Sequence, residues 1–241
     1  MIVIPMAGES RRFAQAGYRE PKYQLMLGGE SVFGHAVGSF EASFATMPFL
    51  FVVRAGAAAF VAQACARLGV AEARVVELAG PTAGQAETVD LGLAAAAVAD
   101  ETPLTIFNID TFRPGFRFPD AGWAADSDGW LEVFRGTGAN WSYVRPAEGA
   151  EPQAIETAEK RPISDLCCTG LYHFRRAGDF RRALARERAA PSTTELYVAP
   201  LYNHLIADGR RIHYRLIERE AVVFCGVPAE YEALLAASPP Q

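Results

Sequence analysis

The sequence has few cysteines, no excess of positive charge and no long apolar run. Its four cysteines form no C-x-x-C pair, which argues against zinc ligation or a disulfide framework and favours buried, reduced thiols. The formal net charge of -5 argues against a general nucleic-acid or membrane binder, because such proteins carry a basic surface. No stretch reaches the roughly 20 apolar residues of a membrane helix, and the first residues lack a basic leader, so we expect a cytoplasmic protein.

Two common nucleotide-binding motifs are also missing. The sequence has no G-x-x-x-x-G-K-[ST], which excludes a P-loop NTPase, and no G-x-G-x-x-G after the first apolar run, which argues against a dinucleotide-dependent dehydrogenase. The four histidines show no ligand spacing, so we expect them to be structural. Asp126-x-Asp128 leaves open the metal-binding D-x-D of a glycosyltransferase, although its Gly- and Asp-rich surroundings also predict a solvated turn.

Over about the first 110 residues, short apolar runs alternate with Ala-rich stretches, which predicts βαβ units. The expected strands are residues 2–6, 49–53, 74–78 and 104–109, and the expected helices are residues 32–44, 57–68 and 84–99. Because strands linked by helices run parallel, this half predicts a mostly parallel sheet.

After Asp110 the pattern changes to shorter strand-like runs. These are residues 129–135, 141–145, 153–158, 167–174, 212–217 and 221–224. Two helices should follow residue 174, the second opened by the capping-box pattern of residues 192–195, and a terminal helix should begin at Pro228. We predict an α/β fold, a Rossmann-like three-layer αβα sandwich with a mixed, mostly parallel central sheet and a β-rich second lobe. One domain would span residues 1–241, with lobes at 1–112 and 113–241.

The loop after the first strand is rich in positive charge. It carries Arg11, Arg12, Arg19 and Lys22 within a dozen residues of an otherwise acidic chain. Ligands of open α/β sheets bind beyond the carboxyl ends of the strands, where this loop starts, so the cations could bind a triphosphate. A solvated basic loop would give the same composition.

Two further polar segments follow predicted strands. Asp110 stands just beyond an apolar strand, where a carboxylate and substrate phosphates could hold Mg²⁺, or where it could begin a turn before Pro114. Gln85 follows a Gly-rich turn and could contact a pyrimidine edge. However, Thr82-x-x-Gln85 is also a capping box, which would occupy Gln85 locally.

Taken in order, these segments resemble the motifs of the sugar-1-phosphate nucleotidyltransferases, whose fold is similar to that of the A-type glycosyltransferases. The resemblance runs from residue 1 to about residue 232. The matching residues are Ala7-Gly8, Arg12-Phe13, Pro21-Lys22, Gly84-Gln85-Ala86-Glu87-Thr88, Asn108-Ile109-Asp110, Ala158-Glu159-Lys160, Gly170-Leu171-Tyr172-His173-Phe174 and Glu195-Leu196-Tyr197.

The resemblance implies a reaction and a set of site residues. An NTP would give its nucleoside monophosphate to a sugar 1-phosphate or a similar phosphorylated small molecule, releasing pyrophosphate, with Mg²⁺ as cofactor. Arg12 would bind the leaving phosphates, Lys22 the α-phosphate and Asp110 the metal. The nucleotide contacts would be Ala7, Gly8, Ser10, Arg11, Gln85 and Asn108, and the acceptor contacts Glu159, Lys160, Gly170 and Glu195. The resemblance also implies a role in surface-polysaccharide precursor synthesis and leaves a homo-oligomer open.

Two departures from the family pattern stand out. Ser10 replaces the second glycine of the opening loop. Residues 224–228 lack the second metal-binding aspartate that many members carry; Glu218 or Glu220 could substitute, or one carboxylate could suffice. These departures motivate an alternative, a catalytically silent protein that binds a nucleotide or a nucleotide sugar.

Overall fold

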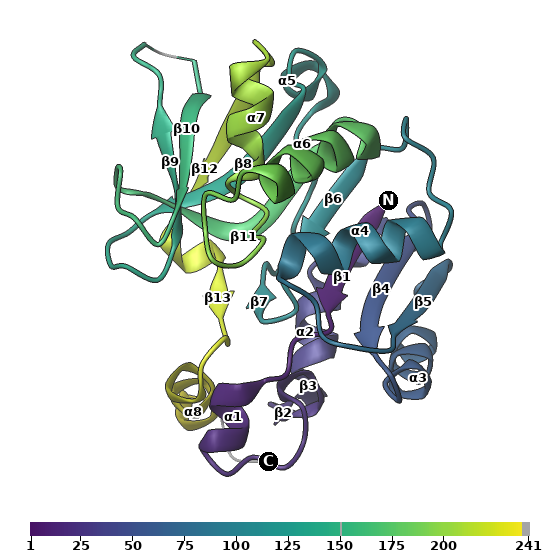
Figure 1. Cartoon of the computed structure of the whole chain (residues 1–241). Helices are drawn as coiled ribbons and strands as arrows, with labels where there is room; N and C mark the ends of the chain where they lie inside the picture. Colours follow the sequence, from purple (N-terminus) through teal and green to yellow (C-terminus); the bar gives the residue numbers. More distant parts are fainter. Residues whose placement is uncertain (150, 238–241) are drawn as a thin grey trace.

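The computed structural model describes residues 1–149 and 151–237, which form a nine-stranded mixed sheet with helices on both faces (Figure 1). The strands of this sheet are β1 (Ile2–Met6), β4 (Phe49–Arg54), β5 (Ala73–Leu78), β6 (Leu104–Phe107), β8 (Gly129–Arg135), β9 (Ser142–Pro146), β10 (Gln153–Glu159), β11 (Leu166–Phe174) and β12 (Ile212–Ile217). Two-residue strands form two small ladders, β2 (Met26–Leu27) with β3 (Glu30–Ser31), and β7 (Thr111–Phe112) with β13 (Val223–Phe224).

Two hydrophobic clusters, one on each face of the sheet, hold the helices. One includes residues of α2 (Val32–Gly38) and α3 (Ala58–Leu68), and the other residues of α4 (Gln85–Ala95), α6 (Ala177–Ala189) and α7 (Leu201–Ala207). The remaining helical elements are α1 (Arg11–Gln15), η1 (Lys22–Gln24), η2 (Glu41–Ser43), α5 (Ala121–Ala125), η3 (Arg219–Ala221) and α8 (Pro228–Ala237). Burying an apolar stripe of each helix against the sheet is what stabilises such layers.

The strand order is β5-β4-β1-β6-β11-β8-β12-β10-β9. Pairing is parallel from β5 to β6 and again between β8 and β12, whereas the other neighbouring pairs are antiparallel. The strands of the first half are thus parallel as predicted, but the whole sheet is evenly mixed, so the prediction of a mostly parallel central sheet was wrong. β11 causes the change, because it inserts antiparallel between β6 and β8.

Three of the expected helices differ from the structure. The helix expected over residues 32–44 ends at Gly38 and is followed by the separate turn η2, and the one expected over 84–99 ends at Ala95. The capping-box pattern at residues 192–195 opens no helix, because that segment is irregular and α7 begins at Leu201. By contrast, α3 closes at Gly69 in the left-handed conformation (φ 79°), as expected for a helix C-terminus.

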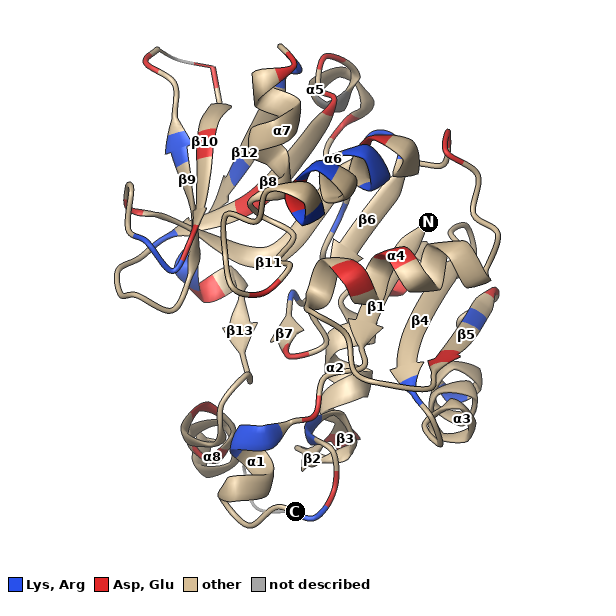
Figure 2. Cartoon of the chain, viewed as in Figure 1, with Lys and Arg blue, Asp and Glu red and all other residues tan. Residues whose placement is uncertain are grey.

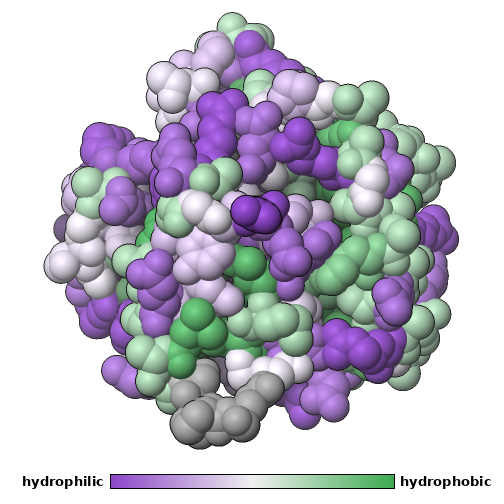
Figure 3. Space-filling view, turned by 90° about the horizontal axis from the view of Figure 1, so that it is seen from below, coloured by the Kyte–Doolittle hydropathy of each residue, from purple (hydrophilic) through white to green (hydrophobic). Residues whose placement is uncertain are grey.

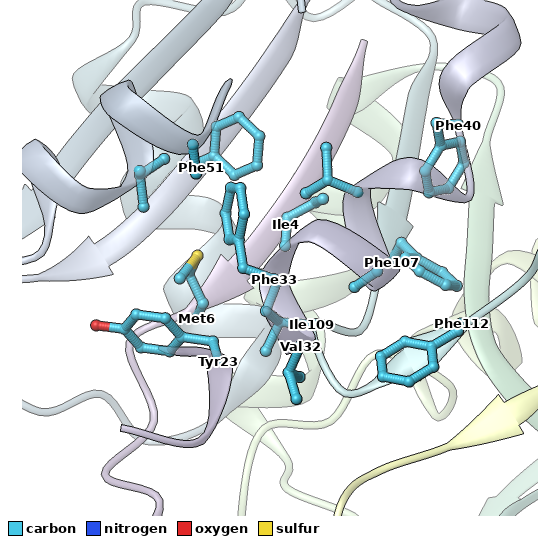
Figure 4. Close-up of a cluster of buried hydrophobic side chains, with 14 of the residues drawn as sticks. Ile4, Met6, Tyr23, Val32, Phe33, Phe40, Phe51, Phe107, Ile109 and Phe112 are labelled. Carbon is cyan, nitrogen blue, oxygen red and sulfur yellow. The ribbon is translucent and has the colours of Figure 1, made fainter. Parts of the chain in front are cut away.

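A buried aromatic and aliphatic cluster lies beneath the carboxyl ends of β1 and β6 (Figure 4). Met6 ends β1, Tyr23 belongs to η1 and Ile109 follows β6, and all three are less than 8% exposed. Tyr23 and Ile109 each stand next to a predicted site residue, Lys22 and Asp110. The packed core therefore fixes the backbone from which these two charged side chains emerge.

The outer surface is mixed in character. Figure 3, seen from below, shows hydrophobic residues in separate groups among hydrophilic ones. Met26 of β2 and Leu235 of α8 are among the exposed large hydrophobic residues, at 55% and 41%. Within the described residues, no helix combines the length and the apolar composition needed to cross a bilayer.

Candidate active site

A cavity of about 1040 Å³ opens at the carboxyl ends of β1 and β6. Its wall runs from the loop after β1, through the turn before α4 and the segment after β6, to the ends of β9, β10 and β11 and the start of α8. It contains all of the predicted site residues except Lys160, and none of the four histidines. Segments far apart in sequence thus meet where an open α/β sheet binds its ligands.

Lys22 and Asp110 form an ion pair at the centre of this wall. The Lys22 ammonium donates to Oδ2 of Asp110, and the two side chains are only 20% and 23% exposed. The backbone of Asp110 is held as well, since its carbonyl accepts the N–H of Cys225 at 2.8 Å. A cation and a carboxylate predicted for catalysis are therefore in direct contact.

The loop after β1 keeps its shape despite lacking the second glycine. Ser10 has φ 49°, in the left-handed region that favours glycine, and its carbonyl accepts the N–H groups of Phe13 and Ala14 at the start of α1. Ser10 therefore adopts the backbone conformation that explains a glycine at this position in the family pattern.

The cations of this loop are arranged around α1, the blue segment beside α8 in Figure 2. Arg11 donates to Glu9 at 2.5 Å, whereas the exposed Arg12 guanidinium has no hydrogen bond to any residue in the described part of the chain. Arg19 is exposed and does not line the cavity. Three of the four predicted cations thus reach the cavity, and Arg19 does not.

Gln85 faces the cavity and is not part of a capping box. Its Nε2 donates to Oδ1 of Asn108 at 2.5 Å, while Thr82 bonds instead to Thr88 and to the carbonyl of Gly84. Room for the Asn108 amide comes from Gly170 (φ 94°), where a Cβ would lie 2.4 Å from Nδ2 of Asn108. Gly170 thus acts by positioning Asn108, a role that the sequence did not indicate.

The far end of the cavity is built from hydrogen-bonded pairs. The Ser142 hydroxyl donates to the half-buried carboxylate of Glu159, and burial raises the pKa of that carboxyl. Lys160 does not line the cavity, yet its ammonium donates at 2.5 Å to the hydroxyl of Tyr197, which does. Of the predicted acceptor residues, Glu159, Gly170 and Glu195 therefore line the cavity, whereas Lys160 supports Tyr197.

Residues 191–200 form an irregular loop fastened to α6 and to the turn before α4. Both the hydroxyl and the N–H of Ser192 donate to Oε1 of the buried Glu187, at 2.6 and 2.7 Å. The backbone of Leu196 bonds to Ala83 and Ala86 in the turn before α4, at 2.9 and 2.8 Å. Gly84 permits this contact, since a Cβ there would lie 2.6 Å from the Leu196 backbone. The bonds from Ser192 to Glu187 and the long-range bonds of Leu196 hold this segment, so the capping box never forms.

Several cavity residues were not found from the sequence. Trp141 and Phe224 lie against each other, with ring centroids 4.6 Å apart, and Glu230 lines the wall near Asp110. Glu218 and Glu220, the sequence candidates for a second metal ligand, do not line the cavity. Glu230 lies in the first turn of α8, where an acidic residue is common, so its local sequence did not indicate a role in the cavity.

Asp126 and Asp128 are not part of the site. They pair with Arg211 and Arg210, and neither lines the cavity, so the D-x-D interpretation is not supported by their position. The fold and the site together define an α/β protein with a polar, partly cationic ligand cavity.

Solved structures similar to this chain identify its family. A nucleoside-diphosphate-sugar pyrophosphorylase from Vibrio cholerae RC9 is 52% identical, with a TM-score of 0.92 over 98% of this chain and 100% of that one. The inositol-1-phosphate CTP transferase from T. maritima (15% identity, TM-score 0.71, 97% and 93% coverage) and the UTP-bound UGPase from Acinetobacter baumannii (15%, 0.72, 98% and 92%) share the fold. No protein-family model and no curated protein matches the chain.

The chain belongs to the nucleoside-diphosphate-sugar pyrophosphorylases, a family of sugar-1-phosphate nucleotidyltransferases. The resemblance read from its motifs is thereby confirmed, and the protein is a nucleotidyltransferase.

Proposed function

We propose that this enzyme binds an NTP against residues 1–112 and a phosphorylated acceptor against residues 113–241, and joins them as a nucleoside-diphosphate product. One observation carries the proposal. In a single cavity, Arg11, Arg12 and Lys22 lie on the side of β1, and Glu159 and Glu195 lie on the side of β10 and β11. The cationic side suits a triphosphate, and carboxylates suit the hydroxyl groups of a sugar.

The reaction needs positioning rather than an activating base. An oxygen of the acceptor phosphate attacks the α-phosphorus in line, the bond from that phosphorus to the β-phosphate breaks, and pyrophosphate leaves. Because the attacking oxygen is already anionic, the protein must align two anions and stabilise the charge that develops. Arg12, whose guanidinium has no partner among the described residues, would bind the leaving pyrophosphate, and Lys22 would bind the α-phosphate.

The residues present fit a Mg²⁺ ion whose remaining ligands would be nucleotide phosphates and water. Within the described residues, no group of three His, Cys, Asp or Glu side chains could hold a metal alone. Mg²⁺ commonly takes one or two carboxylates together with substrate phosphates and water, so Asp110 beside the phosphate loop suits it. When bound, the ion would offset the repulsion between the two phosphates. Asp110 would hold the ion, and Lys22, its neighbour in the structure, would bind the α-phosphate.

The pathway, location and assembly remain proposals. We propose, from the family resemblance, a cytoplasmic enzyme of surface-polysaccharide precursor synthesis that could act as a homo-oligomer, within a Rossmann-like three-layer arrangement. Neither a nucleic acid nor a membrane is proposed as a partner. The catalytically silent alternative has less support, because Ser10 retains the left-handed loop conformation and the Lys22–Asp110 pair is intact.

Pyrophosphate release tests the proposal. The purified protein is incubated with Mg²⁺, each common NTP in turn and a pool of sugar 1-phosphates and other phosphorylated small molecules. We expect release with a preferred NTP, dependent on acceptor and abolished by EDTA. Asp110→Asn should lower the rate at least about 100-fold, the order of loss seen when one electrostatic group of an active site is removed. Nucleotide-induced stabilisation without release from any NTP would instead support the silent binding protein.

A further inference from the structure

The short strand β13 brings the start of α8 against Asp110. Phe224 pairs with Thr111 and Val223 with Phe112, and the N–H of Cys225 donates to the carbonyl of Asp110 at 2.8 Å. Residues 226–230 therefore begin at a fixed position beside Asp110, although more than a hundred residues separate them in sequence. Both Gly226 and Glu230 line the cavity.

Gly226 lies against two carboxylates. A Cβ on Gly226 would lie 3.1 Å from Oδ2 of Asp110 and 3.7 Å from Oε2 of Glu230. Both oxygens thus lie close to the same point, where a side chain on residue 226 would be in tight contact with Asp110. Oδ2 is also the atom that receives the Lys22 ammonium, so a positive charge already binds on this side of Asp110.

Glu230 is held in place by backbone groups that leave half of its carboxylate free. Its Oε2 accepts the N–H of Gly226 at 2.8 Å and that of Val227 at 3.3 Å, at the first turn of α8. Its Oε1 accepts no hydrogen bond from any residue in ranges 1–149 and 151–237. A carboxylate fixed at one oxygen and free at the other is suited to bind a hard cation.

We propose that Glu230 is the second carboxylate ligand of the divalent cation, taking the place of the aspartate that residues 224–228 lack. This inference rests on the proposed function, which assigns the cation to Asp110. The carboxylate comes from the first turn of α8 and lies against Gly226, which also lies close to Asp110.

The test is binding of Mn²⁺ to the protein alone, measured by the loss of the free-ion signal in electron paramagnetic resonance. Glu230→Gln keeps an oxygen that can accept the two backbone N–H groups, so melting curves should match the wild type. We expect Glu230→Gln and Asp110→Asn each to weaken Mn²⁺ binding by at least about 10-fold, the lower bound for losing even a supporting group of a metal site. Glu218→Gln and Glu220→Gln, the matched controls, should bind as the wild type does.

A rescue variant separates ligation from a general loss of charge. In Gly226→Asp combined with Glu230→Gln, a carboxylate returns close to Asp110, and Mn²⁺ binding should recover most of the loss. Residue 226 has no left-handed φ, and a Cβ there would lie 3.1 Å from Oδ2 of Asp110, so the Asp110 side chain must shift slightly to admit the new residue.

The outcomes distinguish this inference from the proposed function. Unchanged binding in Glu230→Gln with lost binding in Asp110→Asn would overturn the role of Glu230 and leave the enzyme assignment standing. Unchanged binding in both variants, or none in the wild type, would overturn the two-carboxylate site. Pyrophosphate release by the same wild-type preparation would show separately whether the proposed reaction holds.

Discussion

The two ends of the cavity recognise their ligands by different physical means. At the nucleotide end, Arg11 and Arg12 are exposed, and the Arg12 guanidinium has no hydrogen bond to the described residues. At the acceptor end, Glu159 is held by Ser142, Tyr197 by Lys160, and the loop at residues 191–200 by Glu187 and the turn before α4. One end thus offers exposed charge, and the other a hydrogen-bonded framework.

This difference suits the ligands proposed for each end. A triphosphate carries several charges that long cationic side chains can follow, and strong charge interactions compensate for ordering those side chains. A small acceptor offers few groups, so its recognition depends on donors and acceptors that are fixed before it binds. Substitutions at the nucleotide end should therefore act mainly on the rate, and those at the acceptor end on the KM of the acceptor.

The largest effect is expected at Arg12. We predict that Arg12→Gln lowers kcat/KM for the NTP by about 10²–10³, the usual loss on removing one group that stabilises transition-state charge. Initial rates of pyrophosphate release give this value. Arg19→Gln is the control, because Arg19 is exposed and lies outside the cavity. An equal loss in both variants would mean that the net charge of the loop matters and the position of Arg12 does not.

A smaller and more selective effect is expected at Glu159. We predict that Glu159→Gln raises the KM of the acceptor by about 10-fold, since a hydrogen bond to a charged group contributes about 1.5–3 kcal/mol. The KM of the NTP should stay unchanged, as measured by varying each substrate at saturation of the other. Glu156→Gln is the matched control on the same strand, because Glu156 pairs with Arg145 and Arg161 and does not line the cavity. A change in the KM of the NTP alone would contradict the division of the cavity.

The first half of the fold could be predicted well from local patterns. β1 occupies the predicted residues 2–6, and α3 closes at Gly69 as its sequence indicates. These elements follow from apolar runs and helix-terminating glycines, whose effects depend only on residues nearby in sequence. In the second half, β11 inserts antiparallel between β6 and β8, and no local pattern encodes that position.

The same limit explains which site residues could be found. Arg12, Lys22 and Asp110 lie in motifs whose order resembles a family, and all three line the cavity. Gln85 and Ser192 were each part of a local capping pattern, but tertiary bonds to Asn108 and Glu187 decide their roles. Glu230 reaches Asp110 only through the pairing of two-residue strands, a signal too short to recognise in sequence.

The smallest expected effect tests whether the two ends act independently. Ser192→Ala removes the hydroxyl that donates to Glu187 and keeps the bond from the Ser192 N–H, so the loop at residues 191–200 should loosen without unfolding. A single hydrogen bond contributes about 1 kcal/mol, which corresponds to about a 5-fold rise in the KM of the acceptor. Steady-state kinetics with each substrate varied in turn would measure it.

The KM of the NTP in Ser192→Ala decides how that result is interpreted. Leu196, in the same loop, bonds to Ala83 and Ala86 on either side of Gln85. If only the KM of the acceptor rises, the bonds of Leu196 hold the turn before α4 even when the loop loosens near Ser192. If both KM values rise by the same factor, the loop and the turn before α4 loosen together as one unit. The hydrogen-bonded framework would then include the turn that carries Gln85, the predicted nucleobase contact. Only the phosphate-binding loop would recognise its ligand by charge alone.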